Sequence, residues 1–239
     1  FLTLNNVIIK DNIANVSGGG VAIYDRADMN IINCRIIGNT SDGDGAGIWI
    51  LGSSTNKTIV NIDSTEIINN ICQLNYHGGG IYIHGLNPSV VGEAYITNSI
   101  ISGNSNRTGG GVYVGDHAYL EMEYVEISNN IAHPSSSGTG GGICISDQDD
   151  GDPPSIGKLT NVTIFGNNAT YGPSIYLAHG NSFANIQNSI IGGDIETNQA
   201  DFGNPSHLTI DYTNFTPGNE IRSDVSAGGQ GVIYNLSTF

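Results

Sequence analysis

One block of residues recurs along the chain, and this internal repeat restricts the possible folds more than any other feature of the sequence. The block reads apolar, two residues, small or apolar, one residue, Ile, two residues, Asn, as in LNNVIIKDN at residues 4–12. Its last positions, here called the anchors, are Asn12, Asn39, Asn70, Asn104, Asn130, Asn167 and, with Asp replacing Asn, Asp194. Successive anchors are 26 to 37 residues apart, which is too irregular for a leucine-rich repeat but suits stacked coils with loops of variable length.

A second block follows every anchor except the last, and it consists of small residues leading into an apolar–x–apolar triplet. The copies are GGGVAI (18–23), GAGIWI (45–50), GGGIYI (78–83), GGGVYV (109–114), GGGICI (140–145) and GPSIYL (172–177). This alternation has the period of a strand that turns one side to a core and the other to solvent. Each repeat is therefore expected to hold two or three short strands and no helix.

Together the two blocks predict an all-β fold, a right-handed parallel β-helix (solenoid) of about seven to eight coils. In such a fold each strand pairs in parallel with its equivalent in the next coil, about 4.8 Å away. Stacking then buries the apolar side that a single coil leaves open. We expect residues 1–194 to form the regular coils and residues 195–239 to form atypical terminal coils of the same domain. Because the coil pattern starts at Leu2 without a capping segment, we also expect a fragment of a longer chain.

Two internal ladders are expected from the repeat. One is apolar and consists of Ile9, Ile36, Ile67, Ile101, Ile127, Ile164 and Ile191. The other consists of the anchors, because an Asn amide both donates and accepts and can satisfy a neighbouring Asn and the turn. A second Asn column is expected to do the same: Asn6, Asn33, Asn98, Asn161 and Asn188. The alternative is that such residues are exposed at turns, where Asn tolerates a left-handed backbone.

The charge balance restricts the partners of the chain. Seven Lys and Arg residues against 22 Asp and Glu residues give a formal net charge of −15, so nucleic acid is not an expected partner. No apolar run approaches the roughly 20 residues of a membrane helix, so membrane insertion is not expected. Cys34, Cys72 and Cys144 fit no metal-binding spacing and are expected to be buried free thiols.

These coils resemble those of bacterial extracellular parallel β-helix repeat proteins of the pectin-lyase-like superfold. The closest likeness is to polymorphic outer-membrane proteins and surface adhesins, whose coils read NN…GGG(I/V)Y. The stretch NSIIGGDIETN…LTIDYTNFTPG (188–218) resembles the terminal coils of large secreted proteins of this kind, and the resemblance covers residues 2 to about 216. It implies an extracellular or cell-surface protein. Its relatives include adhesins and surface components and, in other branches, polysaccharide lyases and hydrolases, although one superfold hosts many functions.

An enzymatic function would need catalytic groups on the outside of the coils. The strings NTDG, GHG and RIK, by which polygalacturonases resemble one another, do not occur here. The best acidic group is Asp63 and Glu66 in one coil with Glu123 and Glu126 two coils further on. Two coils separate like positions by roughly 10 Å, near the upper limit of about 9.5 Å between the carboxyl groups of inverting glycosidases. The alternative is that these four carboxylates are solvated surface charges.

The middle residues of the apolar triplets form a candidate binding stripe. They include four aromatic residues, namely Trp49, Tyr82, Tyr113 and Tyr176, beside Ala22 and Cys144. If the flanking aliphatic residues point inward, these rings face outward and form a platform for sugar rings or for another protein. The alternative is that they stabilise the sheet by stacking or are covered by a neighbouring loop.

The segment SDQDDGDPPS (146–155) is a candidate calcium site, because it offers several carboxylates on one loop. They are Asp147, Asp149, Asp150 and Asp152, and the alternative is a solvated acidic loop. We expect no other cofactor. The favoured function is non-enzymatic: a structural or adhesive rod that binds cell-surface glycans or proteins, or that stacks end to end with further coils or copies. The alternatives are a polysaccharide-active enzyme and a non-catalytic carbohydrate-binding β-helix.

Overall fold

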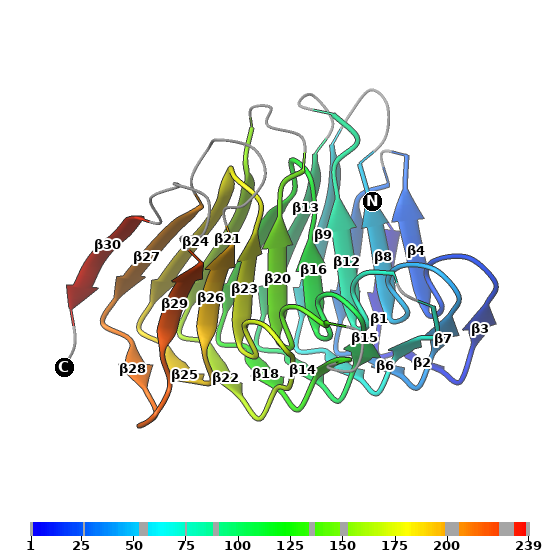
Figure 1. Cartoon of the computed structure of the whole chain (residues 1–239). Helices are drawn as coiled ribbons and strands as arrows, with labels where there is room; N and C mark the ends of the chain where they lie inside the picture. The colour runs from blue at the N-terminus through cyan, green and yellow to red at the C-terminus, as the bar shows by residue number, and fades with distance from the viewer. Residues whose placement is uncertain are drawn as a thin grey trace.

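The computed structural model describes residues 2–25, 27–52, 57–74, 76–87, 91–133, 137–148, 153–198, 206–224 and 232–237, and these ranges contain strands and turns but no helix. The strands belong to four parallel sheets that run along a rod, with the first and last coils at its two ends (Figure 1). Strands of successive coils pair in register, apart from one irregularity between Thr209 and Ile210, and this pairing confirms the parallel β-helix.

Each sheet takes at most one strand from each coil. Sheet A consists of β1 (Leu2–Asn5), β5 (Met29–Ile32), β9 (Thr58–Asp63), β13 (Gly92–Thr97), β17 (Tyr119–Glu123), β21 (Ser155–Thr160), β24 (Ser182–Gln187), β27 (His207–Asp211) and β30 (Val232–Ser237). Sheet B consists of β2 (Ile8–Lys10), β6 (Arg35–Ile37), β10 (Glu66–Ile68), β14 (Ile100–Ser102), β18 (Glu126–Ser128), β22 (Thr163–Phe165), β25 (Ile190–Gly192) and β28 (Asn214–Phe215).

The other two sheets complete each coil. Sheet C is short and consists of β3 (Ile13–Ala14), β7 (Thr40–Ser41), β11 (Ile71–Cys72), β15 (Ser105–Asn106) and β19 (Ile131–Ala132). Sheet D consists of β4 (Val21–Tyr24), β8 (Ile48–Leu51), β12 (Ile81–His84), β16 (Val112–Val114), β20 (Ile143–Ser146), β23 (Ile175–Ala178), β26 (Ile195–Asn198) and β29 (Ile221–Asp224). The first five coils thus hold four strands each, more than the two or three expected.

A sharp corner divides the repeated block between sheets A and B. The corner residue has a left-handed backbone, with φ between 46° and 57°, in all eight coils: Asn6, Asn33, Ser64, Asn98, Tyr124, Asn161, Asn188 and Tyr212. None of the five Asn residues among them is buried. The prediction of a second internal Asn ladder is therefore wrong, and Asn recurs here because its short side chain tolerates this conformation.

The anchor Asn residues form the predicted ladder between sheets B and C. Asn70 is representative: its backbone N–H and its Nδ2 both donate to Asn104 Oδ1, each over 2.9 Å, and Nδ2 also donates to the Ile36 carbonyl, over 3.0 Å. The same pattern links Asn12 through Asn39 to Asn70, and Asn104 through Asn130 to Asn167. Asn39, Asn70, Asn104 and Asn130 are fully buried, so the ladder satisfies amides and backbone groups that water does not reach.

Asp194 does not continue this ladder, contrary to the prediction. In its coil the chain passes from β25 to β26 through two residues, without a sheet C strand. Ile195 pairs with Ile175, so Asp194 lies level with Ser174, at the end of the small-residue block. Its carboxylate instead contacts Arg222 Nη2 at 3.0 Å and accepts the Glu220 backbone N–H at 2.8 Å. A carboxylate that is bound in this way does not fit into a ladder of buried Asn side chains.

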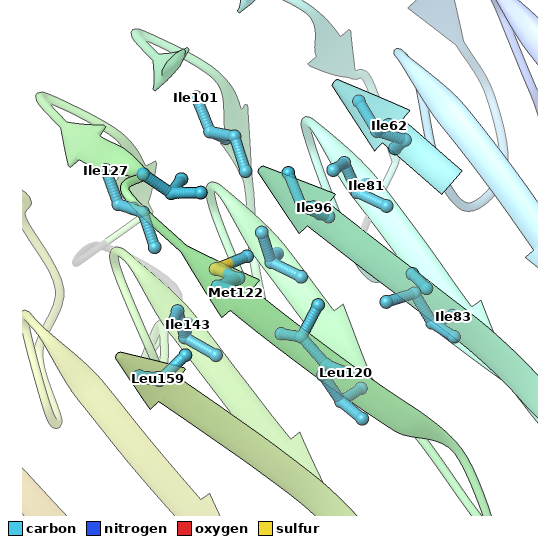
Figure 2. Close-up of a cluster of buried hydrophobic side chains, with 14 of the residues drawn as sticks. Ile62, Ile81, Ile83, Ile96, Ile101, Leu120, Met122, Ile127, Ile143 and Leu159 are labelled. Atoms are coloured by element: carbon cyan, nitrogen blue, oxygen red, sulfur yellow. The ribbon is translucent and has the colours of Figure 1, made fainter. Parts of the chain in front are cut away.

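The core fills the interior of the rod with one aliphatic cluster. The predicted isoleucine ladder is confirmed, because Ile36, Ile67, Ile101, Ile127, Ile164 and Ile191 are fully buried in it and Ile9 packs against it. Figure 2 shows a section of this core, with Ile62, Ile96, Met122 and Leu159 of sheet A facing Ile81, Ile83 and Ile143 of sheet D. Because these inner positions are apolar, polar side chains that bind a ligand or catalyse a reaction must lie on the outer faces of the sheets.

The first coil has a neighbouring coil on one side only, since β1, β2, β3 and β4 are each the edge strand of their sheet. Four of its apolar side chains are exposed: Leu2 by 60%, Ile8 by 59%, Ile13 by 78% and Val16 by 73%. An open edge with apolar side chains is a surface suited to pairing with another strand.

Candidate functional site

The outer face of sheet A carries aromatic and charged side chains on neighbouring coils. Along β13 and β17, Ala94, Ile96, Leu120 and Met122 are buried in the core. The residues that alternate with them therefore face outward, because successive side chains of a strand point to opposite sides. The group they form, here called the sheet A cleft, consists of Glu93, Tyr95, Tyr119 and Glu121, together with Lys57 from the preceding coil.

Contacts within the sheet A cleft hold its side chains in place. The rings of Tyr95 and Tyr119 lie 5.7 Å apart between centroids. Glu93 receives Lys57 Nζ at 2.5 Å and the Tyr95 hydroxyl at 3.1 Å, and the Tyr119 hydroxyl donates to Glu121. Lys158, on the next coil, lies over the Tyr119 ring with Nζ 5.1 Å from its centroid. Side chains held by such contacts lose little conformational entropy when a ligand binds.

Both tyrosines are kept protonated. Burial and the neighbouring Glu93 carboxylate raise the pKa of Tyr95 to about 12. Burial and the hydrogen bond to Glu121 likewise raise the pKa of Tyr119. At neutral pH each hydroxyl is therefore a hydrogen-bond donor attached to an apolar ring face.

A cavity of about 210 Å³ adjoins these side chains. Its apolar walls include Val91, Pro154 and Ile156. The buried His117 holds Pro153, which also lines the cavity, because His117 Nδ1 lies 2.8 Å from the Pro153 carbonyl oxygen and donates to it. The cleft thus combines ring faces, an apolar recess and a few fixed polar groups, which is the usual composition of a small-ligand site.

The sequence interpretation missed this site. The repeated block begins only at the inward Ile96 and Met122, so the outward residues before them fell outside the pattern that was followed. A signal was present in the alternation of EAYIT (93–97) and AYLEME (118–123), where polar or aromatic residues alternate with apolar ones.

The four carboxylates considered for catalysis lie on two sheets and not on one face. Asp63 is in register with Thr97 and Glu123 on sheet A. Glu66 is in register with Ile100 and Glu126 on sheet B. The left-handed Ser64 turns the chain between the two sheets, and this corner was not foreseen.

Asp63 and Glu66 are also held by neighbouring groups. Asn98 and Thr97 donate to Asp63 Oδ1 over 2.8 and 2.7 Å, and these hydrogen bonds lower the pKa of the Asp63 carboxyl. Glu66 contacts Arg35 Nε at 2.6 Å. A glycosidase general acid needs a raised pKa, so the environment of Asp63 does not favour that role.

The aromatic stripe lies on the outer face of sheet D, with Trp49, Tyr82, Tyr113, Cys144 and Tyr176 in register. Tyr82, Tyr113, Cys144 and Tyr176 are buried in a second apolar cluster outside the core, and Trp49 packs against them half-buried. The rings of Tyr82 and Tyr113 stack with centroids 5.5 Å apart and planes 4° apart. The stripe exists as predicted in its order along the rod, but most of it is covered.

Two histidines contribute to this cover. The His77 ring lies 4.5 Å from that of Tyr113, and the His84 ring stacks on Tyr82 at 5.6 Å. His77 contacts Asp44 at 3.2 Å and His84 contacts Asp116 at 3.3 Å. Burial alone would raise the pKa of Asp116, but hydrogen bonds from His84 and the Gln148 N–H outweigh it and lower the pKa. Each ring is thus fixed by a carboxylate, as expected of a packed side chain.

The acidic loop is described only in part. Asp147 is buried and its Oδ2 accepts the Ser155 N–H over 3.0 Å, whereas Asp149, Asp150 and Asp152 lie outside the described residues. Across the ranges that are described, no group of three or more His, Cys, Asp or Glu side chains is arranged to hold a metal ion. Calcium binding by this loop stays a prediction.

The three cysteines are free and buried, as expected. Burial raises the pKa of Cys72 to about 11 and that of Cys144 to about 12. A thiol so far from ionisation at neutral pH is a poor nucleophile, so neither Cys72 nor Cys144 is suited to covalent catalysis.

Comparisons of the chain with known protein families, with curated proteins and with solved structures find no match. Within the described parts of the chain, no helix is long and apolar enough to cross a membrane. The function must therefore be argued from the residues themselves.

Proposed function

We propose that this chain is part of a non-catalytic extracellular or cell-surface rod that binds glycans through the sheet A cleft. The observation that carries the proposal is the pair of fixed tyrosine rings, Tyr95 and Tyr119, beside carboxylates and an apolar cavity of about 210 Å³. The location at the cell surface rests on the resemblance of the coils to bacterial surface proteins.

The chemistry of the sheet A cleft matches that of a sugar ring. A pyranose has an apolar face of C–H groups that packs on an aromatic ring, and hydroxyls around its edge that donate to carboxylates. Tyr95 and Tyr119 offer the ring faces, while Glu93 and Glu121 offer acceptor oxygens. Because consecutive coils repeat about every 4.8 Å, further positions along the rod can follow a chain of sugars.

The charges favour a neutral glycan. Lys57 is paired with Glu93, and Lys158, which lies over the Tyr119 ring, is in register with Glu121. The two ammonium groups are thus matched by two carboxylates, and the cleft has no net positive charge to attract an anionic sugar. The net charge of −15 further repels polyanions such as acidic polysaccharides.

Binding to oligosaccharide panels tests the proposal. The intact chain should bind one or more immobilised neutral oligosaccharides, and Tyr119→Ala should weaken that binding about tenfold, the effect of one lost aromatic contact. Phe165→Ala is the matched control, because Phe165 is a 40% exposed ring on sheet B, away from the cleft, and its removal should leave affinity unchanged.

The same samples separate binding from catalysis. No reducing ends should appear when the chain is incubated with neutral and acidic polysaccharides. Turnover that disappears in Glu126→Gln would overturn the non-catalytic proposal. Equal glycan affinities of the Tyr119→Ala and Phe165→Ala variants would show that the sheet A cleft is not the binding site.

The exposed edge of the first coil favours assembly as a second function. Ile13 and Val16 are apolar and more than two-thirds exposed on an edge that has free strand positions in all four sheets. Pairing with another coil, from a longer chain or from a second copy, would cover them and extend the sheets.

A further inference from the structure

The outer face of sheet A continues beyond the sheet A cleft as a row of apolar and aromatic side chains, here called the sheet A lane. Its members are in register on the successive strands β17, β21, β24 and β27: Tyr119, Ile156, Phe183 and His207. Of these strands, β21, β24 and β27 can be followed side by side along the rod in Figure 1. Neighbours in sequence such as Leu120, Ala184 and Leu208 are buried in the core, so the members of the lane face outward.

The far end of the sheet A lane is a second pair of stacked rings. The rings of Phe183 and His207 lie 4.4 Å apart between centroids, with their planes 15° apart. Both side chains are half-buried, so packing holds one part of each ring while another part reaches the surface. Phe183 is two coils from Tyr119, which places their backbones roughly 10 Å apart.

Ile156 makes the lane continuous with the sheet A cleft. It is in register with Tyr119 on one side and with Phe183 on the other, and it also lines the cavity beside the cleft. In the opposite direction the column continues with Glu93, which is buried and contacts Lys57. The apolar surface therefore extends from the cleft toward β27.

A polar column borders the lane. It lies two positions further along each strand and consists of Glu121, Lys158, Asn185 and Thr209. Lys158 and Asn185 are exposed, and Thr209 is half-buried. Beyond Lys158 this column offers an amide and a hydroxyl, which are neutral groups that both donate and accept hydrogen bonds.

We propose that the sheet A lane binds an extended, unbranched neutral glycan that runs from the sheet A cleft to the Phe183–His207 pair. Its sugar rings pack on the apolar side chains, and its hydroxyls along one edge face the polar column. This inference rests on the proposed function and adds the direction, the length and the shape of the ligand.

The shape of the ligand follows from the straight course of the lane. Tyr119 and His207 are three coils apart, roughly 14 Å along the rod. A disaccharide on Tyr95 and Tyr119 leaves the far end of the lane uncovered, whereas a hexasaccharide covers it. Glucose units joined through equatorial bonds form an extended chain that can follow the lane, whereas the axial bonds of maltose-type chains curve away from it.

Cellobiose, cellohexaose and maltohexaose, titrated into the intact chain by calorimetry, test the inference. Cellohexaose should bind at least tenfold more tightly than cellobiose, because it gains the contact with the second pair of rings. Maltohexaose, which has the same composition as cellohexaose, should bind about tenfold more weakly than cellohexaose. Equal affinities of cellohexaose for the chain and of either other sugar would refute the inference.

Variants at the far end separate a contact there from the mere presence of more sugar units. Phe183→Ala should lower the affinity for cellohexaose about tenfold and leave that for cellobiose unchanged, and Phe165→Ala on sheet B is again the control. His207→Ala should also weaken cellohexaose binding, whereas His207→Phe keeps a stacked ring and should retain it. Unchanged cellohexaose affinity in folded Phe183→Ala or His207→Ala protein would refute the inference.

Tyr119→Ala distinguishes a failure of the lane from a failure of the cleft. It should weaken the binding of both cellobiose and cellohexaose. If Tyr119→Ala weakens binding but Phe183→Ala and His207→Ala do not, the sheet A cleft stands and the lane is refuted. If none of the three sugars binds, the lane is refuted, and the panel of neutral oligosaccharides decides separately on the cleft.

Discussion

Removing one member of the Asn ladder should destabilise the rod far more than removing an exposed Asn. Asn104 is fully buried, and its side chain takes part in four hydrogen bonds. Its Oδ1 accepts the backbone N–H and the Nδ2 of Asn70, and its Nδ2 donates to the Ile67 carbonyl and to Asn130 Oδ1, all over 2.9 to 3.0 Å. Asn104→Leu preserves volume but deletes all four.

The expected magnitude follows from the groups left behind. Asn130 Oδ1 keeps the Asn104 backbone N–H, and the Ile67 carbonyl stays in the ladder between β10 and β14, so two buried groups are left without a partner: the Asn70 backbone N–H and one Asn70 amide hydrogen. An unsatisfied buried polar group costs about 1–3 kcal/mol, so the free energy of unfolding should fall by about 2–6 kcal/mol. That is a large part of the roughly 5–15 kcal/mol that stabilises a typical domain.

Urea unfolding measures the total effect, and hydrogen exchange measures where it arises. The Asn70 amide, which loses its acceptor, should exchange faster in Asn104→Leu. The control is Asn188→Gly, at an exposed corner with φ of 49°, where Gly adopts the backbone without strain and stability should change by a few tenths of a kcal/mol. A loss below about 1 kcal/mol for Asn104→Leu, with unchanged Asn70 exchange, would refute the reasoning that the ladder stabilises the coils.

Three further predictions concern other parts of the rod. Gly103→Ala should destabilise the fold, because Gly103 has φ of 66° and a Cβ there would overlap Asn69 Oδ1. In an Asn69→Gly background, the loss of unfolding free energy measured in urea should drop to the backbone strain alone, about 1–2 kcal/mol. Asp63→Asn should lower stability at pH 7, because hydrogen bonds from Asn98 and Thr97 lower the pKa of the Asp63 carboxyl in the folded protein. This stabilisation is complete above the unfolded pKa of about 3.9 and disappears as the pH falls through the lower folded pKa. The thermal melting temperatures of the two proteins should therefore converge at acidic pH. Light scattering over a range of concentrations should detect end-to-end association that Ile13→Lys weakens, and a stable monomer at all concentrations would contradict assembly through the first coil.

The inner columns could be predicted from the sequence because every coil gives them the same environment. Ile101 and Asn104 recur at a fixed separation, and a residue repeated in one register must meet its own equivalent in the next coil. The corner at Asn98 could not be read the same way. Asn suits a left-handed backbone as well as a ladder, and Tyr124 and Tyr212, which take the same φ, give no sign of a turn in the sequence. The prediction that Asp194 continues the ladder was wrong for a related reason. Its spacing from Ile191 fits the repeat, but its coil omits sheet C.

For the outer faces, the sequence predicts the order of the side chains along the rod but not which of them are exposed. The register of Tyr82 with Tyr113 follows from the repeat, but their burial depends on His77 and His84, which belong to no repeated position. The sheet A cleft depends in the same way on a contact outside the repeat, that of His117 with Pro153. Side chains brought in by loops of unequal length have no periodic signal, so the candidate site required the structure.

The sheet A cleft adjoins a connection that lies outside the repeat, and this follows from how a β-helix can vary. Its interior is fixed by stacking, so a new surface arises where an outer column changes residue or where a loop lengthens. The connection from β20 to β21 is among the longest in the chain. It contributes Pro153 and Pro154 to the cavity beside the sheet A cleft, and the Pro153 carbonyl accepts the hydrogen bond from His117. Binding is therefore best sought where a long connection meets an outer column of side chains, and in this chain the sheet A cleft is such a place.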